Sequence, residues 1–198
     1  MRILAFSDLH LSRTQARLLV KASARADLVV AAGDFCNMRK GLELAMEMLS
    51  GINCPIIAVP GNAESFDELK AVSLPNMHVL HGSEVTLKGV QFFGIGYAVP
   101  APPFGDWSMN LSELEAKTML TLCQRADVLI SHSPPKGYGD RTSTGISAGS
   151  VSVLQAIDEI QPRLALFGHV HDSWGYRGQI GQTQLANLGP VPSVFELD

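Results

Sequence analysis

The amino-acid sequence predicts an α/β fold, a four-layer αββα sandwich in which two mixed sheets are flanked by helices. In the first half, short apolar runs rich in β-branched residues alternate with amphipathic segments, which is typical of βαβ units and a largely parallel sheet. Residues 77–97 contain three short strand-like runs in succession, and strand-like runs also fill the chain after His171. Two sheets covered by helices account for both patterns.

The elements follow from the same patterns in chain order. Buried strands, apolar on both faces, are expected at residues 3–6, 28–32, 56–59, 128–130 and 164–167. Helical periodicity marks residues 14–24, 42–49, 111–125 and 150–160. Ser112, followed by Glu113 and Glu115, is a typical helix N-cap.

Shorter strands are expected at residues 77–80, 84–87 and 91–94, joined as hairpins by turns at 81–83 and 88–89, and again at 174–179, 182–187 and 194–197. Two loops separate these elements. Residues 98–110 contain three prolines, and residues 133–149 are polar and rich in glycine. A loop as long as the second is usually functional or mobile. Since no stretch has the composition of a linker, we expect one domain over residues 1–198.

Composition excludes several classes of protein. The 198 residues suffice for a full core, and 15 Lys and Arg against 19 Asp and Glu give a net charge of −4. This charge argues against a surface that binds duplex nucleic acid or an anionic membrane, although one cation site would suffice for a small nucleotide. Three widely spaced cysteines predict no disulfide framework, and no apolar run is long enough for a signal peptide or a membrane span. We therefore expect a cytoplasmic protein.

Polar residues directly follow five of the predicted strands. They are Asp8 and His10, Asp34, Asn62, His132, and His169 with His171. The carboxyl ends of strands in open α/β sheets form ligand sites. The spacing of two between Asp8 and His10 places both side chains on one side if the backbone stays extended.

These residue types suit a metal centre. Each histidine alone is more simply explained as an ordinary hydrogen-bonded side chain. That explanation does not account for seven Asp, Asn and His residues at one sheet edge. Imidazole with carboxylate and amide oxygens suits Mn²⁺, Fe or Zn²⁺. An aspartate between two imidazole sets can bridge two ions, which lower the pKa of a shared water and support in-line displacement at phosphorus.

The ordered set resembles the signature of calcineurin-like metallophosphoesterases: Asp-x-His at residue 8, Gly-Asp at 33, Gly-Asn at 61, a lone histidine at 132 and Gly-His-x-His at 168. The resemblance implies the αββα sandwich and two divalent metals, with Mn²⁺ first and Fe or Zn²⁺ as alternatives. It implies that Asp8, His10, Asp34 and His171 bind one ion, and that Asp34, Asn62, His132 and His169 bind the other. A hydroxide bridging the two ions would attack phosphorus, with Asp34, Asn62 and His132 as the catalytic residues.

One position departs from the family pattern. The family has histidine after Gly-Asn, where it contacts phosphate and assists the leaving group, whereas this chain has Gly61-Asn62-Ala63-Glu64. Loss of a general acid typically costs about 10²–10⁴ in rate. We therefore expect a phosphodiesterase more than a broad monoesterase, with Glu64 as an alternative acid. A binding module on the same fold is the second hypothesis, because some proteins similar to the family are scaffolds.

Other residues have alternative interpretations. Lys136, Asp140 and Arg141 could reach a bound phosphate or be merely solvated, and Phe104 and Trp107 could stack on a nucleobase or cover the core. Asn62 could also cap a helix at residues 64–70. The expected substrate is a small phosphoester, nucleotides included. The sequence does not distinguish among cyclic nucleotides, dinucleotides, phospholipid-derived diesters and phosphoproteins. It also does not indicate the oligomeric state.

Overall fold

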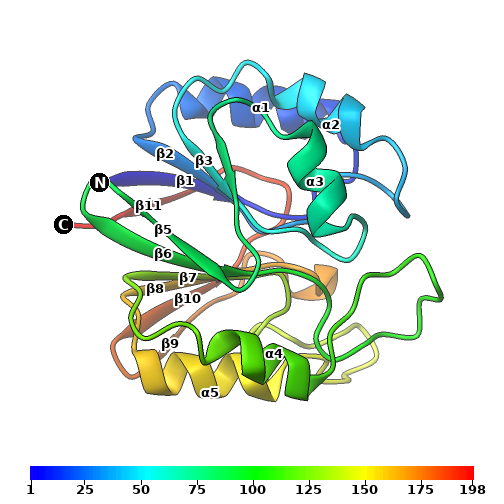
Figure 1. The fold of residues 1–198 in the computed structure, drawn as a ribbon, viewed down its shortest axis with the longest axis vertical. Coiled ribbons are helices and arrows are strands. Elements are labelled where there is room, and N and C mark those ends of the chain that lie inside the picture. The colour runs from blue at the N-terminus through cyan, green and yellow to red at the C-terminus, as the bar shows by residue number, and fades with distance from the viewer.

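The computed structural model describes residues 1–198 and has the four predicted layers (Figure 1). Helices α1 (Arg13–Ser23), α2 (Leu42–Leu49) and α3 (Phe66–Val72) cover one sheet. Helices α4 (Glu113–Leu120) and α5 (Val151–Ile160) cover the other sheet, at the bottom of the view. The predicted αββα sandwich of two mixed sheets is therefore confirmed.

The first sheet has five strands in the order β11-β1-β2-β3-β4. Their bounds are β11 Ser193–Glu196, β1 Arg2–Phe6, β2 Leu28–Ala31, β3 Ile56–Ala58 and β4 Met77–Val79. Strands β1 to β4 run parallel, and β11 pairs antiparallel with β1. The parallel part of this sheet collects the carboxyl ends of β1, β2 and β3 at one edge.

The second sheet has six strands in the order β5-β6-β7-β8-β10-β9. Their bounds are β5 Ser83–Leu87, β6 Val90–Ile95, β7 Val128–Ser131, β8 Leu164–Phe167, β10 Thr183–Asn187 and β9 Arg177–Ile180. Its four central strands are parallel, and β5 and β9 are antiparallel edge strands. The carboxyl ends of β7 and β8 thus also lie together.

Each strand of the centre contributes to two apolar interfaces. Leu4 and Phe6 of β1 belong to a buried cluster that includes residues of α1, α2 and α3. The alternate residues Ile3 and Ala5 belong to a second cluster, shared with strands of both sheets. A third cluster joins the second sheet to α4 and α5. Every central strand is therefore covered on both sides, which explains why the sequence shows these strands as apolar on both faces.

One predicted hairpin is wrong. Strand β4 does not pair with β5; it extends the first sheet in parallel to β3, with His78 opposite Ile57, and the chain then crosses to the second sheet. The partly buried Met77 packs on the cluster under the first layer of helices, which stabilises β4 beside β3. The predicted hairpin of β5 and β6 is confirmed, with its turn at Lys88 and Gly89 in the left-handed region.

Two boundaries and one possible cap differ clearly from the prediction. Helix α4 ends at Leu120, several residues before the expected end at 125. Strand β9 begins at Arg177 because a 3₁₀ turn, η1 (His171–Ser173), precedes it. Helix α3 is capped by Ser65, whose hydroxyl accepts from the N–H of Glu68, so Asn62 is not its cap. The predicted cap of α4 by Ser112 is confirmed.

None of the helices is both long and apolar enough to cross a lipid bilayer.

Candidate metal centre

All seven predicted site residues meet where the carboxyl ends of the two sheets face each other. Asp8, His10 and His171 place ligand atoms within 4.8 Å of one another, and so do Asp8, Asp34 and His132. Asn62 joins through a 3.1 Å contact of its Oδ1 with Nε2 of His132. The His169 ring lies 4.9 Å from the His132 ring, centroid to centroid.

The backbone turns at this edge, rather than extended strands, aim the side chains. Asp8 (φ 53°), His10 (φ 44°), Asp34 (φ 59°) and His169 (φ 68°) all adopt the left-handed region. The extended backbone that the spacing argument for Asp8 and His10 required is therefore not present. Left-handed non-glycine residues cost about 1–3 kcal/mol each and cluster at functional sites, where the surrounding fold holds them.

The glycines before Asp34 and Asn62 allow the two turns to touch. A β-carbon on Gly61 would lie 2.0 Å from Oδ1 of Asp34, and one on Gly33 would lie 2.6 Å from the Cα of Gly61. No residue with a side chain fits these positions without moving the turns apart. The Gly-Asp and Gly-Asn pairs therefore have a steric cause in the approach of β2 to β3.

Asp34 lies between two imidazole groups. Its Oδ2 is 3.5 Å from Nε2 of His10, and its Oδ1 is 3.5 Å from Nε2 of His132. The N–H of Ala63 donates to Oδ1 at 2.8 Å and fixes the carboxylate. One carboxylate oxygen thus faces each histidine, which is the arrangement that a bridging ligand of two ions needs.

Hydrogen bonds away from the centre determine which imidazole nitrogens carry protons. Nδ1 of His132 lies 2.7 Å from the carbonyl of Ala32, and Nδ1 of His10 lies 3.0 Å from the carbonyl of Cys36. A carbonyl only accepts, so each Nδ1 is the donor and each neutral ring has a lone pair on Nε2. Second-sphere carbonyls orient metal-binding histidines in the same way.

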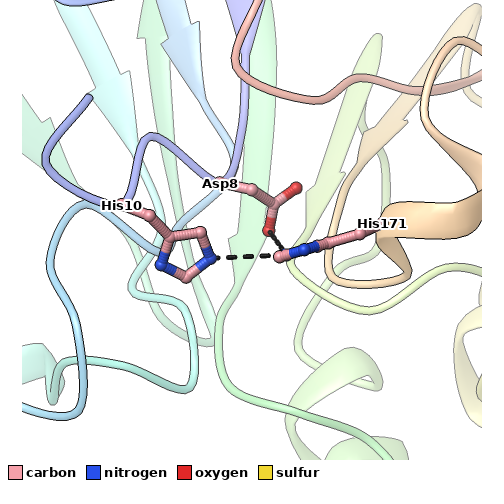
Figure 2. A group of neighbouring side chains, drawn as sticks. All are labelled: Asp8, His10 and His171. Carbon is pink, nitrogen blue, oxygen red and sulfur yellow. Dashed lines mark hydrogen bonds and ion pairs between the residues drawn. The ribbon is translucent and has the colours of Figure 1, made fainter. Parts of the chain in front are cut away.

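The atoms that face one another in the centre are therefore mostly acceptors. Nε2 of His10 is 3.3 Å from Nε2 of His171, which in turn is 3.8 Å from Oδ1 of Asp8 (Figure 2). Nε2 of His132 faces oxygens of Asn62 and Asp34. Lone pairs at these separations repel unless a proton or a metal cation lies among them, and imidazole nitrogens with carboxylate and amide oxygens fit a divalent transition metal. The residues present thus fit the two-metal centre of the resemblance.

The electrostatics of the same groups differ from one residue to the next. Burial lowers the pKa of His132, but the charges of Asp34 and Asp8 outweigh burial and raise it above its usual value. Burial raises the pKa of Asp34, but His132 and His10 outweigh it, so that pKa is lowered. Burial, then the charge of His132, lowers the pKa of His169 to about 3. His169 is therefore neutral and keeps a lone pair for a metal.

Three supporting residues were not predicted from the sequence. Nε1 of Trp174 donates to Oδ2 of Asp8 at 2.9 Å, and the hydroxyl of Ser7 donates to the same oxygen. The oxygen Oδ1 of Asn37 lies 2.9 Å from Nδ1 of His10. Trp174 is 166 residues from Asp8 in sequence, so no local pattern could have indicated the contact.

Glu64 is not a candidate acid in the cleft. Its carboxylate is fully buried and accepts hydrogen bonds from the N–H groups of Asp34 at 2.8 Å and Gly61 at 2.7 Å. The N–H of Phe35 donates to its second oxygen at 3.1 Å. The side chain therefore holds the turns after β2 and β3 together and does not line the cleft.

A cleft of about 650 Å³ opens over the centre. Its 17 lining residues include no lysine or arginine. Lys136 donates to the carbonyl of Ser147, and Arg141 to the carbonyl of Gly145, so both loop cations are used within their own loop. Asp140 is buried and accepts from the N–H groups of residues 137 and 149, which holds the same loop.

The walls of the cleft are mostly uncharged and come from the two long loops. The loop at 98–110, green in Figure 1, contributes Pro100, Ala101, Pro102, Pro103, Phe104 and Trp107. The other loop contributes Thr142, Ile146, Ser147 and Ala148. Both loops therefore contribute walls to the site.

Fold and site together define a class: an αββα sandwich with a partly buried carboxylate–imidazole centre suited to divalent metals. The family model described as calcineurin-like phosphoesterase superfamily domain matches residues 1–196. The chain belongs to this superfamily, which confirms the resemblance seen in its motifs.

Curated relatives extend the comparison. Metallophosphoesterase domain-containing protein 1 of Homo sapiens is 31% identical over 116 residues, covering 57% of this chain and 34% of the human protein. A UPF0046 protein of Caenorhabditis elegans is 31% identical over 170 residues, covering 75% of this chain and 58% of the nematode protein. The chain thus spans only part of the length of the curated relatives it matches.

Solved structures share the fold. The protein TT1561 of Thermus thermophilus superposes with a TM-score of 0.75 at 19% identity, over 95% of this chain and 88% of that one. A dimetal phosphatase from Danio rerio superposes with a TM-score of 0.64 at 14% identity, over 96% of this chain and 88% of that one.

Proposed function

We propose that this protein is a dinuclear metal-dependent phosphoesterase that prefers phosphodiesters. The observation that carries the proposal is the position of Asp34, whose two carboxylate oxygens each face a different histidine at 3.5 Å. Membership of the calcineurin-like phosphoesterase superfamily supplies the reaction class.

The proposed ligand sets follow the grouping of the side chains. One ion would be held by Asp8, His10, Asp34 and His171, and the other by Asp34, Asn62, His132 and His169. Mn²⁺ is the first candidate, with Fe and Zn²⁺ as alternatives. When bound, two such ions lower the pKa of a water between them and stabilise the charge that develops on the phosphoryl oxygens.

The chain's own residues hold this arrangement. Asp34, Asn62 and His132 are the proposed catalytic residues, because they place their donor atoms at the centre of the cluster. The backbone carbonyl of Asn62 accepts from the N–H of Met109, which fixes this residue. The Nδ1–H of His132 donates to the backbone carbonyl of Ala32, which fixes its ring. Ligand atoms held in this way need little reorganisation during reaction, which favours catalysis.

The preference for diesters rests on charge and on the missing acid. Ala63 is 1% exposed and has no protonatable group, and Glu64 is committed to backbone N–H groups. A monoester dianion carries one more negative charge than a diester. No lysine or arginine lines the cleft to balance that charge, and the carboxylate of Asp172 lines the cleft. A diester monoanion with an uncharged second substituent matches these walls better.

Hydrolysis of bis(p-nitrophenyl) phosphate and of p-nitrophenyl phosphate tests the proposal, with Mn²⁺ added and after chelation. We expect Mn²⁺-dependent turnover that is faster for the diester. Faster monoester turnover would contradict the proposed specificity. No turnover of either compound in protein holding two Mn²⁺ per chain would favour a non-catalytic binding module on the same fold.

The bridging role has its own test. Asp34→Asn should reduce diester turnover to background, because the amide loses the charge and one of the two oxygens that face the histidines. Asp158→Asn makes the same chemical change at an exposed position of α5 and should leave turnover unchanged. Full activity of Asp34→Asn would contradict the proposed centre.

A further inference from the structure

We infer that the cleft wall formed by Phe104 and Trp107 binds a planar ring, aryl or heteroaryl, carried by the substituent of the phosphodiester. The inference rests on the proposed function, because it names the substrate class of the same cleft. It makes Phe104 a specificity-determining residue.

The two aromatic rings form a flat platform. Phe104 and Trp107 lie parallel, with an interplanar angle of 2° and ring centroids 5.9 Å apart. Trp107 is partly buried and packs on the apolar cluster beneath the first layer of helices, whereas Phe104 is 49% exposed and lines the cleft. Phe104 is therefore backed by a fixed ring and is open toward the cleft.

The platform lies beside the proposed metal ligands. The Phe104 ring centroid is 6.2 Å from that of His169. The base of the loop is fixed to the site, because the N–H of Met109 donates to the carbonyl of Asn62 at 2.9 Å and the N–H of Ala98 to the carbonyl of Met109 at 3.0 Å. A substituent on a phosphoryl group bound at the centre can therefore reach Phe104 directly.

The facing loop adds an apolar contact and is also held in place. Ile146 lines the cleft and is 63% exposed. The hydroxyl of Ser173 donates to the carbonyl of Arg141 at 2.8 Å, and Oδ2 of Asp172 accepts from the N–H of Ser143 at 2.8 Å, which ties this loop to η1. Both walls thus present large apolar side chains to water at a position that a bound substituent would cover.

On the side of Phe104 and Trp107, the chemistry of the cleft wall favours a ring over a charged or sugar-like group. No lysine or arginine is present to pair with a second anion, and the prolines Pro100, Pro102 and Pro103 offer no side-chain hydrogen bonds. Flat aromatic faces gain most from offset stacking with another flat face. Stacking of one ring of this kind typically raises affinity about tenfold.

Isothermal titration calorimetry with unreactive or slowly reacting diesters measures this preference directly. The Mn²⁺-loaded protein is titrated with diphenyl phosphate and dimethyl phosphate, which carry the same charge and differ in their rings. The methyl ester of thymidine 5′-phosphate is the third ligand, because its ring is a nucleobase held one sugar away from phosphorus. Whichever ring compound binds more tightly identifies the source of the ring.

We expect at least one ring compound to bind about tenfold more tightly than dimethyl phosphate, and Phe104→Ala to reduce that ratio to about two or less. Phe104→Leu, which keeps an apolar side chain without a flat face, should reduce the ratio nearly as far. Leu114→Ala removes a large apolar side chain that is 74% exposed on α4 and should leave the ratio unchanged.

An unchanged ratio in Phe104→Ala would overturn the inference, as would equal affinities of all three ligands for the wild-type protein. Diester turnover, measured in parallel, separates this result from failure of the proposed function. A ring preference that depends on Phe104 without turnover supports the binding platform and contradicts the enzyme, and turnover without such a preference does the reverse.

Discussion

Replacing Glu64 with glutamine should destabilise the protein strongly, although the change removes only a charge and keeps the shape. Oε1 accepts from the N–H groups of Asp34 at 2.8 Å and Gly61 at 2.7 Å. Oε2 accepts from those of Phe35 at 3.1 Å and, more weakly, Cys36 at 3.5 Å. Whichever way the amide of glutamine turns, its NH₂ group faces two backbone donors in a fully buried position.

The magnitude follows from those lost hydrogen bonds. Each buried donor left without an acceptor costs about 1–3 kcal/mol, so two of them cost about 4 kcal/mol. Burial raises the pKa of Glu64, so removing its charge relieves part of this cost, and the free energy of unfolding should fall by about 2 kcal/mol. That is a substantial part of the roughly 5–15 kcal/mol that is typical of a folded domain. Because Glu64 joins the turns that carry Asp34 and Asn62, we also expect weaker Mn²⁺ binding.

Urea unfolding followed by circular dichroism, with chelator present, measures the first effect. Burial, and then the charge of Asp34, raises the pKa of Glu64 to about 7, so the titrations are run at pH 8, where the carboxylate is ionised. Glu43→Gln is the matched control, because Glu43 is exposed in the first turn of α2, and it should change the free energy of unfolding by less than about 0.5 kcal/mol. An equally small effect of Glu64→Gln would refute the role of Glu64 in joining the turns.

Two further predictions concern residues that act from outside the predicted ligand set. Trp174→Phe removes the 2.9 Å hydrogen bond to Asp8 and should weaken Mn²⁺ binding, measured by calorimetry, by about tenfold; wild-type affinity would contradict this supporting role. Burial lowers the pKa of His81 to about 4, so the neutral ring is compatible with the fold above pH 6.5, and the free energy of unfolding decreases as the pH falls toward 4. The free energy of unfolding, measured with urea, should therefore decrease between pH 7 and pH 5. In His81→Gln this decrease should be smaller by about 1 kcal/mol, after allowance for solvent screening. The exposed control His78→Gln should leave that loss unchanged, and an unchanged loss in His81→Gln would exclude His81 as its source.

The sequence by itself determined the class of fold and the edge at which the polar residues meet. Apolar runs such as that of β1 report burial on both faces, because alternate residues face opposite sides of a strand. Asp8, Asp34 and His132 directly follow such runs, and the carboxyl ends of parallel strands meet at one edge. Their convergence therefore followed from local patterns, as did the capping of α4 by Ser112.

Only the tertiary structure decided how those residues are aimed and supported. Strand β4 pairs with β3 instead of β5, since periodicity reports burial but not the identity of a neighbouring strand. The left-handed turns at Asp8 and His10 are held by contacts with the turn after β2, including the 3.0 Å hydrogen bond from the His10 N–H to the carbonyl of Asp34.

The same holds for the residues around the centre. Trp174 contacts Asp8, Glu64 contacts the turn after β2, and the mostly uncharged cleft walls come from two loops. Each of these arrangements brings together segments that are distant in sequence. Local sequence patterns report propensity and burial, whereas such long-range contacts depend on how the two sheets and their loops pack together. The residues that meet at the site were therefore visible in the sequence, whereas their geometry depends on the fold.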